Sequence, residues 1–246
     1  MTVLVAIPYY HAAEWIGDAV RSVLAQTHKD TVALVACDGD TPPEGLGESP
    51  NLRVVVFPTN EGAPMTQQAM LLGSHHRWYA PMGADDWLEP EYLERLLSLG
   101  TSANASGELW HNDTGQSLVH DRAHTEFGVF DAGLLRSIGG YAVTMRCGQD
   151  TLLYEDILPH VARVSYLDAP LYHKRLHADS LTSSPTTGYA SPYRASVVDH
   201  NREVRAKCEA LGWDPTLIST YRDGILSPER RAILTERVEM VKRALA

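Results

Sequence analysis

Two kinds of acidic residue in this sequence could do chemistry. Asp85 and Asp86 are adjacent, and paired carboxylates offer the oxygen ligands that hard divalent cations prefer. Asp150 follows Gly148, a residue that permits sharp turns, and a carboxylate there could accept a proton as a general base. Each acid precedes a predicted helix, so helix capping is the alternative role. The residues by themselves leave both alternatives open.

Three further polar clusters share one feature with the acidic pair, since each follows an apolar run. They lie at residues 9–11 (Tyr-Tyr-His), 38–40 (Asp-Gly-Asp) and 60–62 (Asn-Glu-Gly). Asp38 could contact a ligand from such a loop, or it could cap its own backbone in an Asx-turn.

Alternating strands and helices are predicted to position these clusters. Apolar runs predict strands at 3–7, 32–36, 52–57 and 78–82, and helical spacing predicts helices at 13–26, 66–73 and 90–99. This alternation implies a parallel sheet with right-handed crossovers. Ligands of such sheets bind at the carboxyl ends of the strands, where all four clusters fall.

The second half of the chain is less regular. Short strands are predicted at 108–111, 117–120, 164–167 and 171–174, with a hairpin around 113–115, and helices at 132–138, 151–160, 193–211 and 228–245. Residues 182–192 read as a loop. We expect the last helices to pack on the domain or on a second copy in a homo-oligomer. The last helix alternates charges of both signs, which is typical of a solvated face.

Five segments, in order, resemble motifs of family-2 nucleotide-sugar glycosyltransferases with a GT-A fold. Residues 7–11 with 23–27 are similar to "P-x-Y-N … S-L-L-x-Q-T", 35–41 to "V-V-D-D-G-S-T", 82–88 to the DXD region "L-D-A-D-D-x-L", 139–153 to "G-G-F … x-G-E-D-x-D-L" and 171–181 to "Y-R-x-H-x-x-S". Each motif is weak alone, but their order and spacing make the combination specific.

The resemblance implies an α/β GT-A fold, with a Rossmann-like, mostly parallel sheet flanked by helices and a helical C-terminal extension. It implies a catalytic domain at 1–182, with a nucleotide-sugar half (about 1–100) and an acceptor half (about 101–182), followed by a loop and helical extension at 183–246. The implied activity is inverting, metal-dependent transfer from a nucleoside-diphosphate sugar, most simply a UDP-sugar, to a hydroxyl of a glycan, a lipid-linked or another acceptor.

The resemblance also assigns roles to individual residues. It implies Asp150 as general base, Mn²⁺ or Mg²⁺ on Asp85, Asp86 and His177, and donor contacts from Pro8, Tyr10, Asp38, Gly62, Gln67, Asp85 and Arg175. Packing is the alternative for Tyr10, and a water-exposed loop position is the alternative for His177. Trp87 and Trp110 could stack on a sugar or simply pack, and residues 110–113 fall where the acceptor would bind.

Several positions depart from the family pattern. His11 stands for Asn, Cys37 for the first Asp of its loop, Gly83 for the first acid of the DXD, Gln149 for Glu, and Gln67–Gln68 for a common Arg-Asn pair. These departures motivate a rival hypothesis, a non-catalytic nucleotide-sugar-binding subunit. A nucleotidyltransferase is disfavoured because no Gly-rich basic loop follows the first strand, where Pro8 and two tyrosines stand.

The composition of the chain limits its binding partners and its cellular compartment. The 246-residue chain has a net charge of −10, which disfavours general nucleic-acid binding and so a second rival, transfer to modified DNA bases. The predicted cleft is electronegative and should need a cation before it holds a diphosphate.

Three cysteines without a CxxC pair exclude a zinc ribbon and indicate a reducing compartment. With no signal-peptide pattern and no apolar run of about 20 residues, we expect a soluble cytoplasmic protein.

Overall fold

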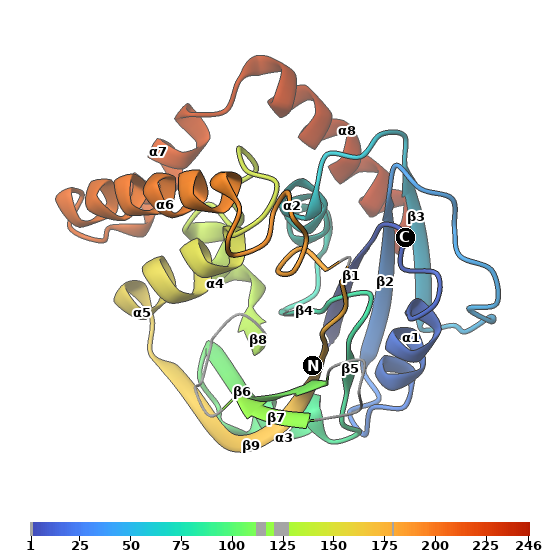
Figure 1. Ribbon diagram of the computed structural model, residues 1–246. Coiled ribbons are helices and arrows are strands. Elements are labelled where there is room, and N and C mark those ends of the chain that lie inside the picture. The colour runs from blue at the N-terminus through green and yellow to red at the C-terminus, as the bar shows by residue number, and fades with distance from the viewer. Residues whose placement is uncertain (1, 112–116, 121–127, 179) are drawn as a thin grey trace.

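A single mixed β-sheet organises the chain, with helices on both of its faces (Figure 1). The computed structural model describes residues 2–111, 117–120, 128–178 and 180–246. The sheet has nine strands, eight of them in the order β3-β2-β1-β4-β8-β6-β9-β5, while β7 pairs with β6. This arrangement confirms the predicted α/β class with helices flanking a sheet and a helical C-terminal region.

The first half of the sheet is parallel, as the sequence predicted. Its strands are β1 (Val3–Tyr9), β2 (Thr31–Asp38), β3 (Leu52–Phe57) and β4 (Trp78–Pro81), joined by parallel pairing. The residues of β1 from Val3 to Ile7 are fully buried because helices cover both faces of the central strands. These helices are α1 (Ile16–Leu24), α2 (Ala63–Gly73) and α3 (Tyr92–Ser98).

The second half of the sheet is largely antiparallel. It contains β5 (Trp87–Leu88), β6 (Ala103–His111), β7 (Ser117–His120), β8 (Gly128–Asp131) and β9 (Val164–Arg175). Only the β6–β9 pair is parallel among the described pairs of this half. The sequence did not identify β5 or β8. The hairpin predicted around 113–115 lies outside the described residues, although its flanking strands β6 and β7 do pair antiparallel.

One strand replaces two that the sequence predicted. The predicted strands at 164–167 and 171–174 are the two ends of β9. Their pairing with β6 shifts register on both sides of Gly107, which lies opposite Pro170. Proline has no N–H to donate to a neighbouring strand, so the ladder is interrupted at this bulge and then resumes. The prediction of two strands was therefore wrong.

The C-terminal helices belong to the same core as the sheet. After α4 (Ala132–Ser137), a π-helical segment η1 (Thr151–Ile157) continues into α5 (Leu158–Val161), where the sequence predicted one helix at 151–160. The last helices are α6 (Pro192–Ala210), α7 (Pro215–Gly224) and α8 (Pro228–Leu245), of which α7 was not predicted.

Close packing ties α8 to the sheet-covering helix α2. In Figure 1, α8 (red) lies beside α2 and near β3, and the residue contacts agree. A side chain at Gly73 of α2 would place its Cβ 2.6 Å from Val241 Cγ1, so the two helices approach at a glycine. Val241 and Ile218 are fully buried in the core that α2 lines. The described helices include none long and apolar enough to cross a membrane.

Candidate active site

The parallel strands bring their carboxyl-end loops to one edge of the sheet, as expected. The loop after β1 meets the loop after β2, because the His11 N–H donates a hydrogen bond of 2.9 Å to Asp40 Oδ2. Tyr10 is half-exposed beside this contact, and Pro8 is partly buried at the end of β1. The Tyr10 ring packs beside the His11 ring, with centroids 3.9 Å apart, and its half-exposed state agrees with both half-buried packing and contact with a ligand.

The acidic pair meets the closing segment that the sequence singled out. Asp85 Oδ2 lies 2.9 Å from His177 Nε2, although the residues are 92 positions apart. A carboxylate only accepts hydrogen bonds, so Nε2 carries the proton in this contact. The His177 ring packs at a tilt against Trp15 of the segment before α1, with ring centroids 4.1 Å apart. His177 is therefore a largely buried partner of Asp85, not the water-exposed loop histidine of the alternative.

Asp86 has a different environment from its neighbour. It is buried, and its two oxygens accept hydrogen bonds from the Tyr172 hydroxyl (2.6 Å) and the Arg175 N–H (2.9 Å). Burial, followed by the nearby Asp85 charge, raises the pKa of Asp86 to about 8, against the opposing hydrogen bond from Tyr172. In this arrangement Asp86 holds the acidic loop against β9, while Asp85 keeps the more accessible carboxylate.

Gly83 stands where the family has the first acid of the DXD, and it packs closely against the two acids that remain. A Cβ at this position would lie 2.4 Å from Asp86 Oδ2 and 2.7 Å from Asp85 Oδ1. The Gly83 N–H also donates to the Tyr172 hydroxyl at 3.0 Å. The two remaining carboxylates therefore occupy the space that a side chain at position 83 would need.

Arg175, for which the resemblance implied a donor contact, lies beside the acidic pair. Its Nε donates to the Asp85 carbonyl at 3.0 Å, and its Nη2 is 3.5 Å from Asp18 Oδ2 on α1, a contact that the sequence did not predict. The guanidinium also stands over the Trp87 ring. Trp87 in turn stacks on His173 with nearly parallel rings, so side chains of the protein contact the Trp87 ring, in agreement with the packing alternative.

Asp38 is buried beneath the strand-end loops instead of lining their surface. Its carboxylate accepts hydrogen bonds from the Glu61 N–H (3.1 Å), the Gly62 N–H (2.8 Å) and Arg237 Nη1 (2.8 Å). Asp38 thus caps the neighbouring loop, not its own backbone. Gln67 is also buried, and its side chain accepts a hydrogen bond from the Tyr79 hydroxyl.

Arg237 is the main residue that the sequence analysis missed. It is almost fully buried, yet it lies on the charge-alternating helix α8 that the pattern assigned to solvent. It is separated from Asp38 by 199 positions, so no local spacing could have indicated the pair.

Asp150 is the N-cap residue of the π-helical segment η1. Its carboxylate accepts a hydrogen bond of 2.9 Å from the Thr151 N–H, and the side chain remains partly exposed. Gly148 before it has a φ of +76°, and a Cβ there would lie 2.5 Å from Val197 of α6. The capping role is therefore present, and the partly exposed carboxylate leaves the general-base role available.

The region predicted to face the acceptor is only partly described. Asn112 and Asp113 lie outside the described residues, as does Asp179 of the closing motif. The Trp110 indole N–H donates to Glu108 at 2.9 Å, and Lys174 stands over the Trp110 ring. This indole also has partners within the protein, which favours packing over sugar stacking.

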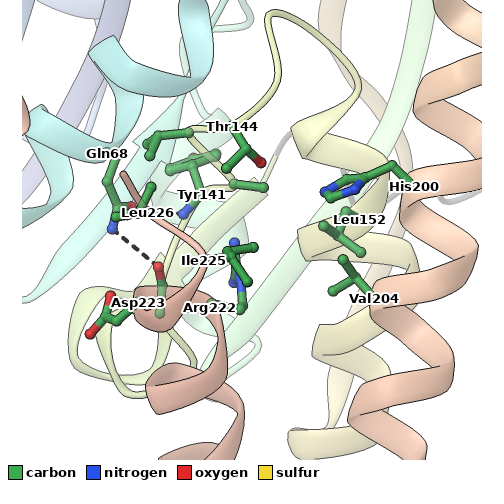
Figure 2. Close-up of a pocket in the computed structure, with 13 residues that line it drawn as sticks. Gln68, Tyr141, Thr144, Leu152, His200, Val204, Arg222, Asp223, Ile225 and Leu226 are labelled. Atoms are coloured by element: carbon green, nitrogen blue, oxygen red, sulfur yellow. Dashed lines mark hydrogen bonds between the residues drawn. The ribbon is translucent and has the colours of Figure 1, made fainter. Parts of the chain in front are cut away.

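A cavity among the C-terminal helices is separate from these residues (Figure 2). Gln68 of α2, His200 of α6 and Arg222 of α7 are among the side chains around it. Its volume is about 20 Å³, and about 10–15 Å³ is enough for one water molecule. The cavity is therefore too small for a nucleotide or a sugar.

Comparison with known proteins identifies the family of the chain. The description "Glycosyl transferase family 2" belongs to the family whose sequence model matches residues 4–136, more than half of the chain. The chain belongs to glycosyl transferase family 2. The match covers the strand-end loops and the acidic pair of this family-2 chain, while α5–α8, including Arg237, lie beyond it.

Two curated relatives share part of the sequence. An uncharacterized glycosyltransferase of Nostoc sp. is 27% identical over 134 residues, which span 51% of this chain and 42% of that protein. The succinoglycan biosynthesis protein ExoO of Rhizobium meliloti is 27% identical over 100 residues, which span 39% of this chain and 29% of that protein. The chain thus spans less than half the length of these relatives.

Solved structures show a similar fold. S. aureus TarS 1–349 in complex with UDP-GlcNAc has a TM-score of 0.63 at 14% identity, covering 100% of this chain and 82% of that one. The complex of the same protein with UDP has a TM-score of 0.57 at 12% identity, covering 100% of this chain and 91% of that one. Because the sequence identity is so low, these matches show the fold of the family-2 chain and nothing about its substrate.

Proposed function

We propose that this chain transfers a sugar from a nucleoside-diphosphate sugar to an acceptor hydroxyl, with inversion and with the help of Mn²⁺ or Mg²⁺. The contact between Asp85 and His177 carries the proposal. It joins the acidic loop to the closing segment, the two places where the motifs imply diphosphate and cation contacts. The TarS complexes with UDP and UDP-GlcNAc, which share the fold, support a UDP-sugar as the donor.

The chemistry of the donor set fits a divalent cation shared with substrate. Among the described residues no group of three or more His, Cys, Asp or Glu side chains could hold a metal ion by itself. Mg²⁺ typically takes one or two protein carboxylates and completes its shell with waters and substrate phosphates, so Asp85 fits such a site. His177 would join the site by releasing the Nε2 proton that faces Asp85. The cation would stabilise the charge that develops on the leaving diphosphate. Asp86 would support the loop instead of binding the ion.

The remaining residues would orient the donor. Tyr10 offers an exposed ring for the nucleotide base, with Pro8 behind it at the end of β1. Arg175 would bring a positive charge next to Asp85 on the diphosphate side, where its Nε already contacts the Asp85 carbonyl. Gly62 is the N-cap residue of α2 and its N–H donates to Asp38, so it would shape the loop that borders the base.

Asp150 would act on the acceptor. As the acceptor oxygen bonds to the anomeric carbon, its proton would pass to the Asp150 carboxylate, and the bond from that carbon to the diphosphate oxygen would break. A single displacement of this kind inverts the anomeric centre.

The three cysteines are free and buried, which supports the proposal that the protein works in the reducing cytoplasm.

A donor panel tests the proposal. Purified protein is incubated with UDP-, GDP- and other nucleoside-diphosphate sugars with Mn²⁺, Mg²⁺ or a chelator, and release of the nucleoside diphosphate is measured. We expect release from a UDP-sugar only with metal. If the protein neither binds nor cleaves any donor under these conditions, the proposal is wrong. Tight donor binding without turnover would instead support the hypothesis of a non-catalytic nucleotide-sugar-binding subunit.

The general base has its own variant. Asp150→Asn should leave UDP affinity unchanged and lower transfer by about 10²–10⁴-fold, the usual contribution of general-base catalysis. Asp156→Asn is the matched control, because Asp156 lies on the same segment but pairs with Arg205 of α6 at 3.3 Å. Undiminished transfer by Asp150→Asn, or loss of transfer in both variants, would contradict the assignment.

A further inference from the structure

The C-terminal helix α8 reaches into the loops of the nucleotide half. Arg237 is 1% exposed, and its Nη1 donates to Asp38 Oδ1 (2.8 Å) and Thr66 Oγ1 (3.1 Å). Its Nη2 donates to the Thr59 carbonyl, and the guanidinium lies over the Phe57 ring. One arginine therefore contacts the end of β2, the loop after β3 and the start of α2.

Asp38 passes this constraint to the backbone of the loop. The carboxylate that accepts from Arg237 also accepts from the Glu61 and Gly62 N–H groups. The backbone after Asp38 also packs closely against this loop, since a Cβ at Gly39 would lie 2.3 Å from the Asn60 N. Arg237, Asp38 and residues 59–62 thus form one unit with little freedom to shift.

A second arginine of α8 repeats the connection. Arg230 lies 3.4 Å from Glu61 Oε2, and its Nε donates to the Val143 carbonyl at 2.8 Å. Arg146, which follows Val143 by three residues, donates to the Asn60 carbonyl at 3.4 Å. Through these contacts α8 also connects the loop to the segment that leads to Asp150.

The helix closest to the loop supplies no such cation. Gln67 of α2, which stands where the family often has arginine, is engaged with Tyr79 instead. Gln68, the next residue, donates to the Gly139 carbonyl and accepts from the Tyr141 N–H, so it turns toward the opposite segment. The positive charge that compensates Asp38 comes from α8.

We propose that Arg237 is a positioning residue for the nucleotide: it holds Asp38 and the loop at residues 59–62 in the shape that receives the base of the donor. This inference rests on the proposed function, because it presumes that the strand-end loops bind a nucleoside diphosphate. By this inference α8, which lies outside the region matched by the family model, contributes to the shape of the donor site.

Calorimetric titration with UDP and Mn²⁺ tests the inference. Arg237→Met should raise the Kd for UDP at least tenfold, and it should raise the KM for the donor with less than a threefold change in kcat. Arg237→Lys should recover part of the affinity, because lysine keeps the charge facing Asp38 but lacks the fork that also reaches Thr59. Arg230→Gln should raise the Kd by a smaller factor, since of the two contacts of Arg230 only the one with Glu61 reaches the loop.

Arg222→Met is the matched control. Arg222 is 6% exposed, lies on α7 and donates to the Ile138 carbonyl, so its loss removes a buried arginine away from the loop. We expect it to lower the unfolding temperature while leaving UDP affinity intact. Amide exchange adds a direct readout, because peptides covering residues 59–62 should exchange faster in Arg237→Met and not in Arg222→Met.

The possible results separate the two claims. A wild-type chain that binds no nucleoside diphosphate would overturn the proposed function and the inference together. A wild-type chain that binds UDP, with a folded Arg237→Met variant of equal affinity, would overturn the inference alone. Equal loss of affinity in Arg222→Met would also overturn it. If Arg237→Met does not fold, Arg237→Lys and Arg230→Gln decide, and wild-type affinity in both would reject the inference.

Discussion

Two buried tyrosines that pack against each other offer a sharp test of the acidic loop. Tyr172 and Tyr92 lie edge to face, with ring centroids 6.2 Å apart. The Tyr172 hydroxyl donates to Asp86 and accepts from the Gly83 N–H, whereas the Tyr92 hydroxyl has no hydrogen-bond partner among the described residues. Replacing each tyrosine by phenylalanine removes a buried hydroxyl, which is hydrogen-bonded in Tyr172 and without a hydrogen-bond partner among the described residues in Tyr92.

The expected magnitudes follow from these contacts. The hydrogen bond from Tyr172 to the Asp86 carboxyl group contributes about 1–3 kcal/mol, and leaving the Gly83 N–H without its acceptor costs about a further 1 kcal/mol. Tyr172→Phe should therefore destabilise the fold by about 2–4 kcal/mol. Tyr92→Phe removes a hydroxyl that is buried without a partner, so it should be neutral or stabilise the fold by up to about 1 kcal/mol. The two variants should therefore differ by at least about 2 kcal/mol.

Urea unfolding followed by circular dichroism measures this difference. We expect a lower midpoint for Tyr172→Phe with an unchanged slope, which identifies a change in stability. For a protein of this size the difference should correspond to at least about 4–8 °C in unfolding temperature. Equal stabilities of the two variants, or a Tyr92→Phe variant that is the less stable, would refute the role given to Tyr172.

Two other predictions concern the loops at the strand ends and the core. Gly83→Ala should displace the acids at 85 and 86 because of the close approach of its Cβ, and calorimetry should find at least tenfold weaker metal-dependent UDP binding; wild-type binding would contradict the packing at this glycine. The three cysteine thiols should resist Ellman's reagent at pH 7–8 in the native protein and react after denaturation, because burial raises the pKa of Cys37 to about 11 and also raises the pKa values of Cys147 and Cys208. Rapid reaction of the native protein would contradict their burial.

The parallel half of the fold was predictable because its signals are local. Runs such as Val3–Ile7 are apolar on both faces of a strand, and parallel strands place their following loops at one edge. The contact between Asp85 and His177 also agrees with a prediction that joined two distant motifs at one cleft. Here the order of the motifs carried long-range information that periodicity lacks.

The missed features depend on long-range packing. Strand β8 has four residues and takes its place from pairing with β4 and β6, and β5 has two. Arg237 sits in a sequence of alternating charges that is indistinguishable from a solvated helix, and its burial follows from the docking of α8 on α2. No window of neighbouring residues contains the Asp38 partner that compensates its charge.

The most direct test of the central claim measures UDP binding with and without Mn²⁺ in the wild type, Asp85→Asn and His177→Asn. We predict that Mn²⁺ strengthens UDP binding by the wild type at least tenfold and that both variants lose this gain. Glu89→Gln is the control, since it removes one negative charge three residues beyond the acidic pair, where Glu89 faces His173 at 2.8 Å. It should keep the full effect of the metal. An undiminished response to Mn²⁺ in Asp85→Asn would contradict the account.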